Sequence, residues 1–154
     1  MTLDAGTPAP DFTLKDQDGH DVVLSSYRNT SNVVLVFYPF TFTGVCQGEL
    51  CALREDLSQF ETANAQLLAL SCDSRFAQQR WAKQEGFTFP LLSDFWPHGK
   101  VSRAYGVFNE QIGAANRATF VIDKSGTIVD VFESPDLATP RDQSAYRAAL
   151  ARLG

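Results

Sequence analysis

Cys46 occupies a position in the sequence that suits a reactive sulfur. Upstream of it, the apolar run 33–38 predicts a strand buried on both faces. From Cys46 onward, apolar residues recur at intervals of four and three, which predicts an amphipathic helix: Leu50, Leu53, Leu57 and Phe60. Cys46 would then lie in a first helical turn, where unpaired backbone N–H groups and the positive end of the helix dipole stabilise a thiolate. An unreactive core cysteine is the alternative.

Thr43 and Pro39 precede Cys46 and could shape a site around it. We expect Thr43 to cap the helix, with its hydroxyl near the sulfur or a bound substrate. A cap without any part in the chemistry is the alternative. Pro39 has no backbone N–H, so it can pack over a pocket without offering a competing donor, although a proline also commonly just ends a strand.

The spacing Pro39-x-x-x-Thr43-x-x-Cys46 resembles the active-site signature of the peroxiredoxins. Other segments similar to that family follow in order along nearly the whole chain: 71–74 with Trp81, 89–94, 105–107 and 116–123. The resemblance is greatest to the actinobacterial alkyl hydroperoxide reductase E type, notably across residues 87–109. It implies a thiol-dependent peroxidase whose Cys46 thiolate reduces hydrogen peroxide, organic hydroperoxides or peroxynitrite and becomes a sulfenic acid.

The resemblance also gives roles to Arg117 and Glu49. From the sequence alone, Arg117 would be a solvated residue before the strand 118–122, but in the family the matching arginine holds the thiolate and orients the peroxide. Glu49 lies one turn after Cys46, and we expect it to pair with Arg117, because a lone carboxylate would disfavour the thiolate. A glutamate favoured only by the helix dipole is the alternative.

Cys51 departs from the one-cysteine relatives and resembles the resolving cysteine of the bacterioferritin-comigratory (Q) peroxiredoxins. In an ideal helix, positions five apart have Cα atoms roughly 8.6 Å apart, whereas a disulfide needs less than about 7 Å. A Cys46–Cys51 disulfide therefore requires the helix start to unwind, which Gly48 eases by about 1 kcal/mol relative to alanine. An unreactive Cys51 is the alternative. Cys72 ends a buried strand and is predicted to fill the core.

The elements that must position these residues follow an order typical of a thioredoxin-like α/β fold. Residues 12–14 and 22–24, around Gly19, predict an N-terminal β-hairpin. Further strands are predicted over 66–71, 89–92, 118–122 and 127–132, and helices over 43–62, 74–85 and 100–105. A last helix would have Thr139 as cap, Pro140 at its first position and Asp142 in its first turn. We expect one domain, residues 1–154, with a central mixed sheet flanked by helices.

Composition excludes several other functions. A formal net charge of −5, without any basic run, argues against a nucleic-acid surface. No secretory signal is visible, and the longest apolar run, 33–38, is too short to span a bilayer. Three cysteines, an odd number, suit reactive thiols in a reducing cytoplasm. Neither His20 nor His98 has metal-ligand spacing with a cysteine, so we expect no metal and no organic cofactor.

The expected partners are a small peroxide and a thiol reductant, namely thioredoxin, a glutaredoxin-like mycoredoxin or a low-molecular-weight thiol. The resemblance also implies a homodimer, and four apolar residues are either contact residues or core: Phe40, Phe42, Trp96 and Phe108. One alternative is a thioredoxin-like disulfide oxidoreductase without peroxidase activity. The absence of a Cys-x-x-Cys motif at Cys46 argues against it. Another is a non-catalytic binding domain on the same fold. This hypothesis would leave Thr43, Cys46 and Arg117 without a common function.

Overall fold

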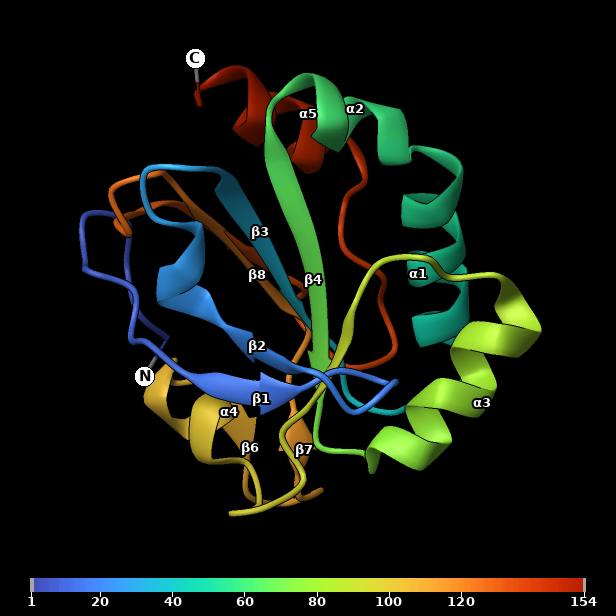
Figure 1. Cartoon of the computed structure of the whole chain (residues 1–154). Coiled ribbons are helices and arrows are strands. Elements are labelled where there is room, and N and C mark those ends of the chain that lie inside the picture. The colour runs from blue at the N-terminus through green and yellow to red at the C-terminus, as the bar shows by residue number, and fades with distance from the viewer. Residues whose placement is uncertain (1, 154) are drawn as a thin grey trace.

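A seven-stranded mixed sheet forms the centre of the protein, whose computed structural model describes residues 2–153 (Figure 1). The strand order is β2-β1-β5-β4-β3-β8-β9. The strands are β1 (Thr13–Lys15), β2 (Asp21–Val23), β3 (Asn32–Phe37), β4 (Ala65–Ser71), β5 (Leu91–Ser93), β8 (Ala118–Ile122) and β9 (Ile128–Glu133). β3, β4 and β5 are parallel, and all other neighbours pair antiparallel. β6 (Phe108–Asn109) and β7 (Ala114–Ala115) form a separate small ribbon.

Both faces of the sheet are covered, as the continuous apolar run in β3 predicts. All six residues of β3 are buried. On one face, the sheet packs against α1 (Gly44–Glu55), α2 (Leu57–Thr62), α3 (Arg75–Glu85) and α5 (Ser144–Ala151). On the other, it packs against the N-terminal segment, the short 3-10 helix η1 (Leu24–Tyr27) and α4 (Lys100–Ala104). The predicted mixed sheet, its flanking helices and the hairpin β1–β2 are confirmed.

Local sequence signals define α3 well. Ser74 caps the helix by accepting the N–H of Ala77, and Gly86 ends it in the left-handed conformation with φ +72°. Within residues 2–153, no helix is both long and apolar enough to cross a bilayer.

The helix predicted over 43–62 is wrong as one element, because it breaks at Asp56. There the N–H of Asp56 closes a turn onto the carbonyl of Leu53, and α2 starts at the next residue. The break turns Phe60 onto Tyr146 of α5, with ring centroids 6.1 Å apart. Packing between α2 and α5 therefore overrides the continuous periodicity.

The predicted start of the last helix is also wrong. α5 begins at Ser144, and Thr139, Pro140 and Asp142 all precede it. The cause is Arg141, which is 3% exposed and whose backbone N–H and guanidinium both bind a carboxylate of α1. This tertiary contact keeps the chain irregular through residue 143 despite its favourable helix-start sequence.

Candidate active site

Cys46 lies in the first turn of α1, which follows β3 after the short connecting segment 38–43. The residue is fully buried in the apolar cluster between the sheet and its helices. The N–H of Gln47 donates to the carbonyl of Thr43 at 2.8 Å, which closes the first turn around Cys46. Backbone N–H groups ahead of that bond have no intrahelical partner, so the sulfur lies at the positive end of the helix.

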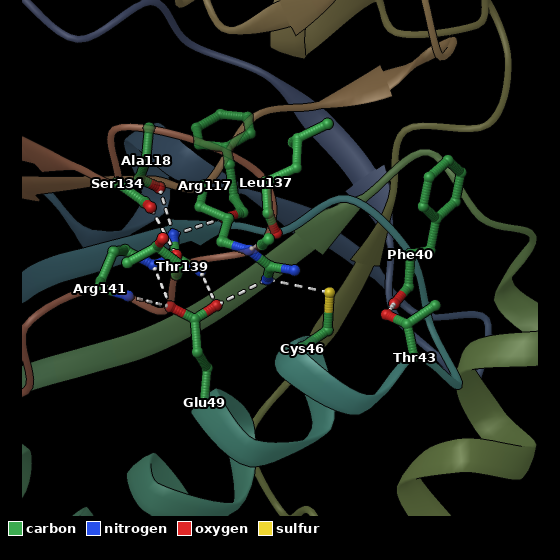
Figure 2. A network of polar contacts seen from close by, with 12 residues as sticks. Phe40, Thr43, Cys46, Glu49, Arg117, Ala118, Ser134, Leu137, Thr139 and Arg141 are labelled. Carbon is green, nitrogen blue, oxygen red and sulfur yellow. Dashed lines mark hydrogen bonds and ion pairs between the residues drawn. The ribbon is translucent and has the colours of Figure 1, made fainter.

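Arg117 reaches the sulfur from the start of β8. Antiparallel pairing of Phe37 with Ala118 brings this point to the end of β3, where the chain leads into α1. Arg117 Nη1 lies 3.0 Å from Cys46 Sγ and 2.8 Å from Glu49 Oε1 (Figure 2). The guanidinium is buried, so water screens its charge only weakly. The structure thus joins Arg117 to both the sulfur and the carboxylate that the sequence singled out.

Arg141 holds Glu49 from the other side. Its backbone N–H and Nε donate to Glu49 Oε2 at 2.6 and 3.0 Å, and Nη2 donates to Oε1 at 2.8 Å. Nη1 donates to the main-chain carbonyls of Phe37 and Ala118. Sequence reasoning missed Arg141, because its surroundings favour a helix start and its partner lies 92 residues away. The one available signal is the inward position of Glu49, a buried carboxylate that needs cations.

Glu49 carries a negative charge between two arginines in this network. Burial by itself would raise the pKa of Glu49, but the hydrogen bonds and charge of Arg141, together with the charge of Arg117, hold it below its usual value. Glu49 is therefore ionised and faces two fixed cations, Arg117 and Arg141. The Arg117 guanidinium therefore lies against both the ionised Glu49 and the Cys46 sulfur.

Thr43 precedes α1 as its N-cap residue, but its hydroxyl does not cap the helix. Instead, Oγ1 donates to the carbonyl of Phe40 at 2.7 Å. Because the hydroxyl proton is directed at Phe40, the oxygen lone pairs are available to another donor. In the view of Figure 2, the Cys46 sulfur lies between the Arg117 guanidinium and Thr43. Pro39 is buried at the end of β3 and contributes no N–H to this space.

Cys51 is held in the unbroken part of α1 and contacts α3 rather than Cys46. Its Sγ lies 3.6 Å from Glu85 Oε1, and Arg54 donates to the carbonyl of Glu85. Burial raises the pKa of the Cys51 thiol, and the hydrogen bond to Glu85 adds to this although Arg54 opposes it. All three cysteines are free. A Cys46–Cys51 disulfide is therefore incompatible with the helix as it stands.

Cys72 is buried beyond the end of β4, where the sequence predicts a core residue. Its Sγ lies 3.8 Å from Ser102 Oγ. Burial and the charge of Asp94 raise the pKa of Cys72 to about 11. Cys72 is consequently a thiol at neutral pH and a poor nucleophile.

Potential metal ligands gather elsewhere in the described chain. Within residues 2–153, one trio of suitable side chains comes together, Asp16, Asp18 and His20 in the β1–β2 turn. The carboxylate of Asp16 already accepts the backbone N–H groups of Asp18 and His20, which shapes the turn. Cys46 does not belong to this trio.

A thiol at a helix start, facing a buried arginine on a thioredoxin-like sheet, defines the class of thiol-dependent peroxidases. Residues 5–131 match the AhpC/TSA family, and the chain belongs to this family.

Individual relatives agree with this assignment. Alkyl hydroperoxide reductase E of Mycobacterium tuberculosis is 54% identical over 151 residues, which covers 98% of each chain. The chloroplastic peroxiredoxin Q of Triticum aestivum is 35% identical over 130 residues, 84% of this chain and 58% of that one. The crystal structure of peroxidoxin BcpB from Mycobacterium tuberculosis superposes with a TM-score of 0.86 at 32% identity, covering 98% of this chain and 96% of that one. The predicted peroxiredoxin family, thioredoxin-like fold and thiol-dependent peroxidase activity are confirmed.

Proposed function

We propose that Cys46 is the nucleophile of this peroxidase and that its substrates are hydrogen peroxide, organic hydroperoxides or peroxynitrite. For a hydroperoxide, the thiolate attacks the terminal oxygen of R–O–O–H, and an S–O bond forms as the O–O bond breaks. The O–O electron pair leaves on RO⁻, which takes a proton from water, and Cys46 becomes a sulfenic acid. The observation that carries this proposal is the 3.0 Å contact between Arg117 Nη1 and Cys46 Sγ inside a buried site.

Arg117 acts on both reactants in this scheme. Nη1 stabilises the thiolate, and Nε is bound to the carbonyl of Leu137 at 2.8 Å. Nη2 has no hydrogen-bond acceptor among residues 2–153, so it can donate to the oxygen that gains negative charge as the O–O bond breaks. Such a donor lowers the barrier most when it is fixed in advance, and Glu49 and Arg141 supply that fixation.

Thr43 and Pro39 orient the peroxide. The lone pairs of Thr43 Oγ1 accept the peroxide O–H, because the hydroxyl proton of Thr43 is already given to Phe40. Accepting this bond turns the terminal oxygen toward the sulfur and the departing oxygen toward Arg117. Pro39 adds a wall without a competing donor.

A thiol reductant restores Cys46 from the sulfenic acid. Thioredoxin, a glutaredoxin-like mycoredoxin or a low-molecular-weight thiol would attack its sulfur directly, which releases water and leaves a mixed disulfide that a second thiol cleaves to free Cys46. Alternatively, Cys51 attacks the sulfenic acid with loss of water after the start of α1 opens, and two thiols of the reductant then reduce the Cys46–Cys51 disulfide. The raised pKa of Cys51 and the intact helix favour direct attack while α1 remains folded. Three free cysteines suit a reducing compartment, for which we propose the cytoplasm.

The exposed aromatic side chains form the contact of a homodimer in this proposal. Among residues 2–153, five large apolar residues are exposed: Phe40 (39%), Phe42 (48%), Phe76 (64%), Phe95 (52%) and Trp96 (81%). Phe76, Phe95 and Trp96 line one groove of about 570 Å³. Each copy offers both a groove and protruding rings, the self-complementarity that a two-fold interface requires. Phe108 is half-buried against Arg103 and is not part of this set.

Sedimentation of Trp96→Lys should show a monomer, whereas the wild-type protein should sediment as a dimer.

The direct assay is loss of peroxide on addition of stoichiometric reduced protein. Wild type, Cys51→Ser and Cys72→Ser should each consume about one equivalent within the first turnover, and Cys46→Ser should consume none. Consumption by Cys46→Ser at the wild-type rate would refute Cys46 as the nucleophile.

A further inference from the structure

The peptide group between Phe40 and Thr41 is hydrogen-bonded on both sides. Its carbonyl accepts Thr43 Oγ1 at 2.7 Å, and its N–H donates to Asp73 Oδ2 at 2.8 Å. Because a peptide group is planar and rigid, fixing the direction of the N–H also fixes the direction of the carbonyl. Asp73 thus reaches the Thr43 hydroxyl through a single peptide plane without touching it.

Asp73 is well placed to act as a fixed anchor. It follows β4, and Ser71 Oγ donates to the same Oδ2 at 2.8 Å. Gln78 Nε2 of α3 donates to Ser71 Oγ at 2.9 Å, and Ser93 Oγ of β5 donates to the carbonyl of Asp73 at 2.6 Å. Two strands and a helix therefore hold the carboxylate that receives the loop.

The loop itself needs such an anchor. Phe42 has φ +67°, a left-handed conformation that costs a bulky residue on the order of 1–3 kcal/mol. Thr41 is tied at a second point, because its Oγ1 lies 3.0 Å from the hydroxyl of Tyr38. Tertiary contacts rather than local preference hold the segment between β3 and α1. Losing the bond to Asp73 would let the strained segment relax and turn the Phe40 carbonyl away from Thr43.

We propose that Asp73 is a positioning residue for peroxide reduction. This proposal rests on the roles given above to Cys46 and Thr43. Asp73 holds the 40–41 peptide so that the Thr43 proton points to Phe40 and the lone pairs of Oγ1 face the peroxide O–H. Within residues 2–153, the side chain of Asp73 bonds only to Thr41 and Ser71, so replacing it leaves the Cys46–Arg117 contact in place.

Two electrophiles separate this role from a general effect on folding. Reaction with peroxide needs Thr43, whereas alkylation by iodoacetamide needs only the thiolate. Asp73→Ala should react with peroxide at least about tenfold more slowly in stopped flow, with alkylation unchanged within about twofold. Asp73→Asn retains an acceptor oxygen and should keep most of the peroxide rate. The proposal would be overturned if Asp73→Ala slowed peroxide reduction and alkylation equally. It would also be overturned if the Asp73→Asn variant reacted with peroxide as slowly as Asp73→Ala.

A double-mutant cycle with Thr43→Val tests whether Asp73 acts through Thr43. If it does, adding Asp73→Ala to Thr43→Val should slow the peroxide reaction by less than about threefold further, and fully multiplicative losses would contradict this. Asp123→Ala is the matched control, because Asp123 also binds loop N–H groups, but in the β8–β9 turn, and both of its rates should equal wild type. If wild type and Cys46→Ser consume peroxide alike, the proposed function itself fails. If they differ as expected while Asp73→Ala keeps the full rate, only the role of Asp73 fails.

Discussion

One guanidinium nitrogen, Arg117 Nη1, serves both the sulfur of Cys46 and the carboxylate of Glu49. Because Glu49 and Cys46 share this donor, the carboxylate would weaken the interaction of Arg117 with the sulfur unless a second cation also binds Glu49. Arg141 provides it through three hydrogen bonds to Glu49. In the proposed mechanism, the reactivity of Cys46 therefore depends on Arg141, which makes no hydrogen bond to the sulfur.

Arg117→Ala removes the donor that, in the proposed mechanism, stabilises both the thiolate and the departing oxygen. The variant should fold and react with peroxide at least about tenfold more slowly, a loss of roughly 1.4 kcal/mol of transition-state stabilisation. Arg117→Lys keeps the charge but loses the forked geometry of the guanidinium, so its rate of reaction with peroxide should lie between those of wild type and Arg117→Ala. Stopped-flow rates that match wild type would remove Arg117 from the site.

Arg141→Met tests the sharing of Arg117. With Arg141 gone, Glu49 draws on Arg117 alone, and the peroxide rate should drop about tenfold. Removing the carboxylate as well, in Glu49→Gln/Arg141→Met, should recover most of the lost rate, because Arg117 is then free for the sulfur. Arg147→Met is the control, since Arg147 is exposed on α5. A double variant slower than Arg141→Met would contradict the mechanism.

At the residue scale, the sequence points to a candidate residue where that residue lies in a local pattern, although the expected cap at Thr43 is wrong. Cys46, Thr43 and Pro39 follow from one short segment, and Arg117 follows only from the family resemblance. Arg141 and Asp73 could not be predicted, because their roles arise from contacts that span 92 and 32 residues. No local propensity or spacing records such contacts.

At the scale of elements, the catalytic cycle that we propose depends on whether the start of α1 opens. Gly48 separates the two cysteines and is exposed, and a Cβ there would meet nothing within 4 Å. Cys51 and Arg54 tie the same helix to the end of α3. Opening the start of α1 must therefore break helical bonds and the contact to Glu85.

If Cys51 resolves, one equivalent of peroxide should give an intramolecular disulfide and faster amide exchange over residues 45–54. Intact mass distinguishes the routes, because a disulfide loses two hydrogens and a sulfenic acid gains an oxygen. Gly48→Ala should stabilise the helix by about 1 kcal/mol and slow disulfide formation several-fold. Trappable sulfenic acid in wild type, with unchanged exchange in α1, would show a one-cysteine cycle.

Elements with strong local signals were predictable from the sequence. The apolar run fixes β3, and Ser74 with Gly86 bounds α3. The break at Asp56 was not predictable, because packing of Phe60 against Tyr146 decides it. The late start of α5 was not predictable either, because it depends on the burial of Arg141. In both places a long-range contact outweighs a good local helix pattern.

For the whole molecule, the ionised Glu49 makes stability depend on pH. Its pKa in the folded protein lies below the unfolded value of about 4.3. The unfolded chain then binds more protons between these two values, so the stabilisation is complete above the unfolded value and is lost as pH falls through the folded one. The free energy of unfolding of wild type should exceed that of Glu49→Gln at neutral pH, and the two should converge on acidification. A difference independent of pH would contradict the linkage.

The most direct test uses a chain whose single cysteine is Cys46, the variant Cys51→Ser/Cys72→Ser. Its reduced form is mixed with one equivalent of peroxide in stopped flow. The product is then digested, and the masses of its peptides are measured by mass spectrometry. We predict loss of about one peroxide per chain at the wild-type rate and a gain of one oxygen on the peptide that contains Cys46. An unreacted Cys46 with the peroxide still consumed, or an oxygen on another residue, would contradict the account.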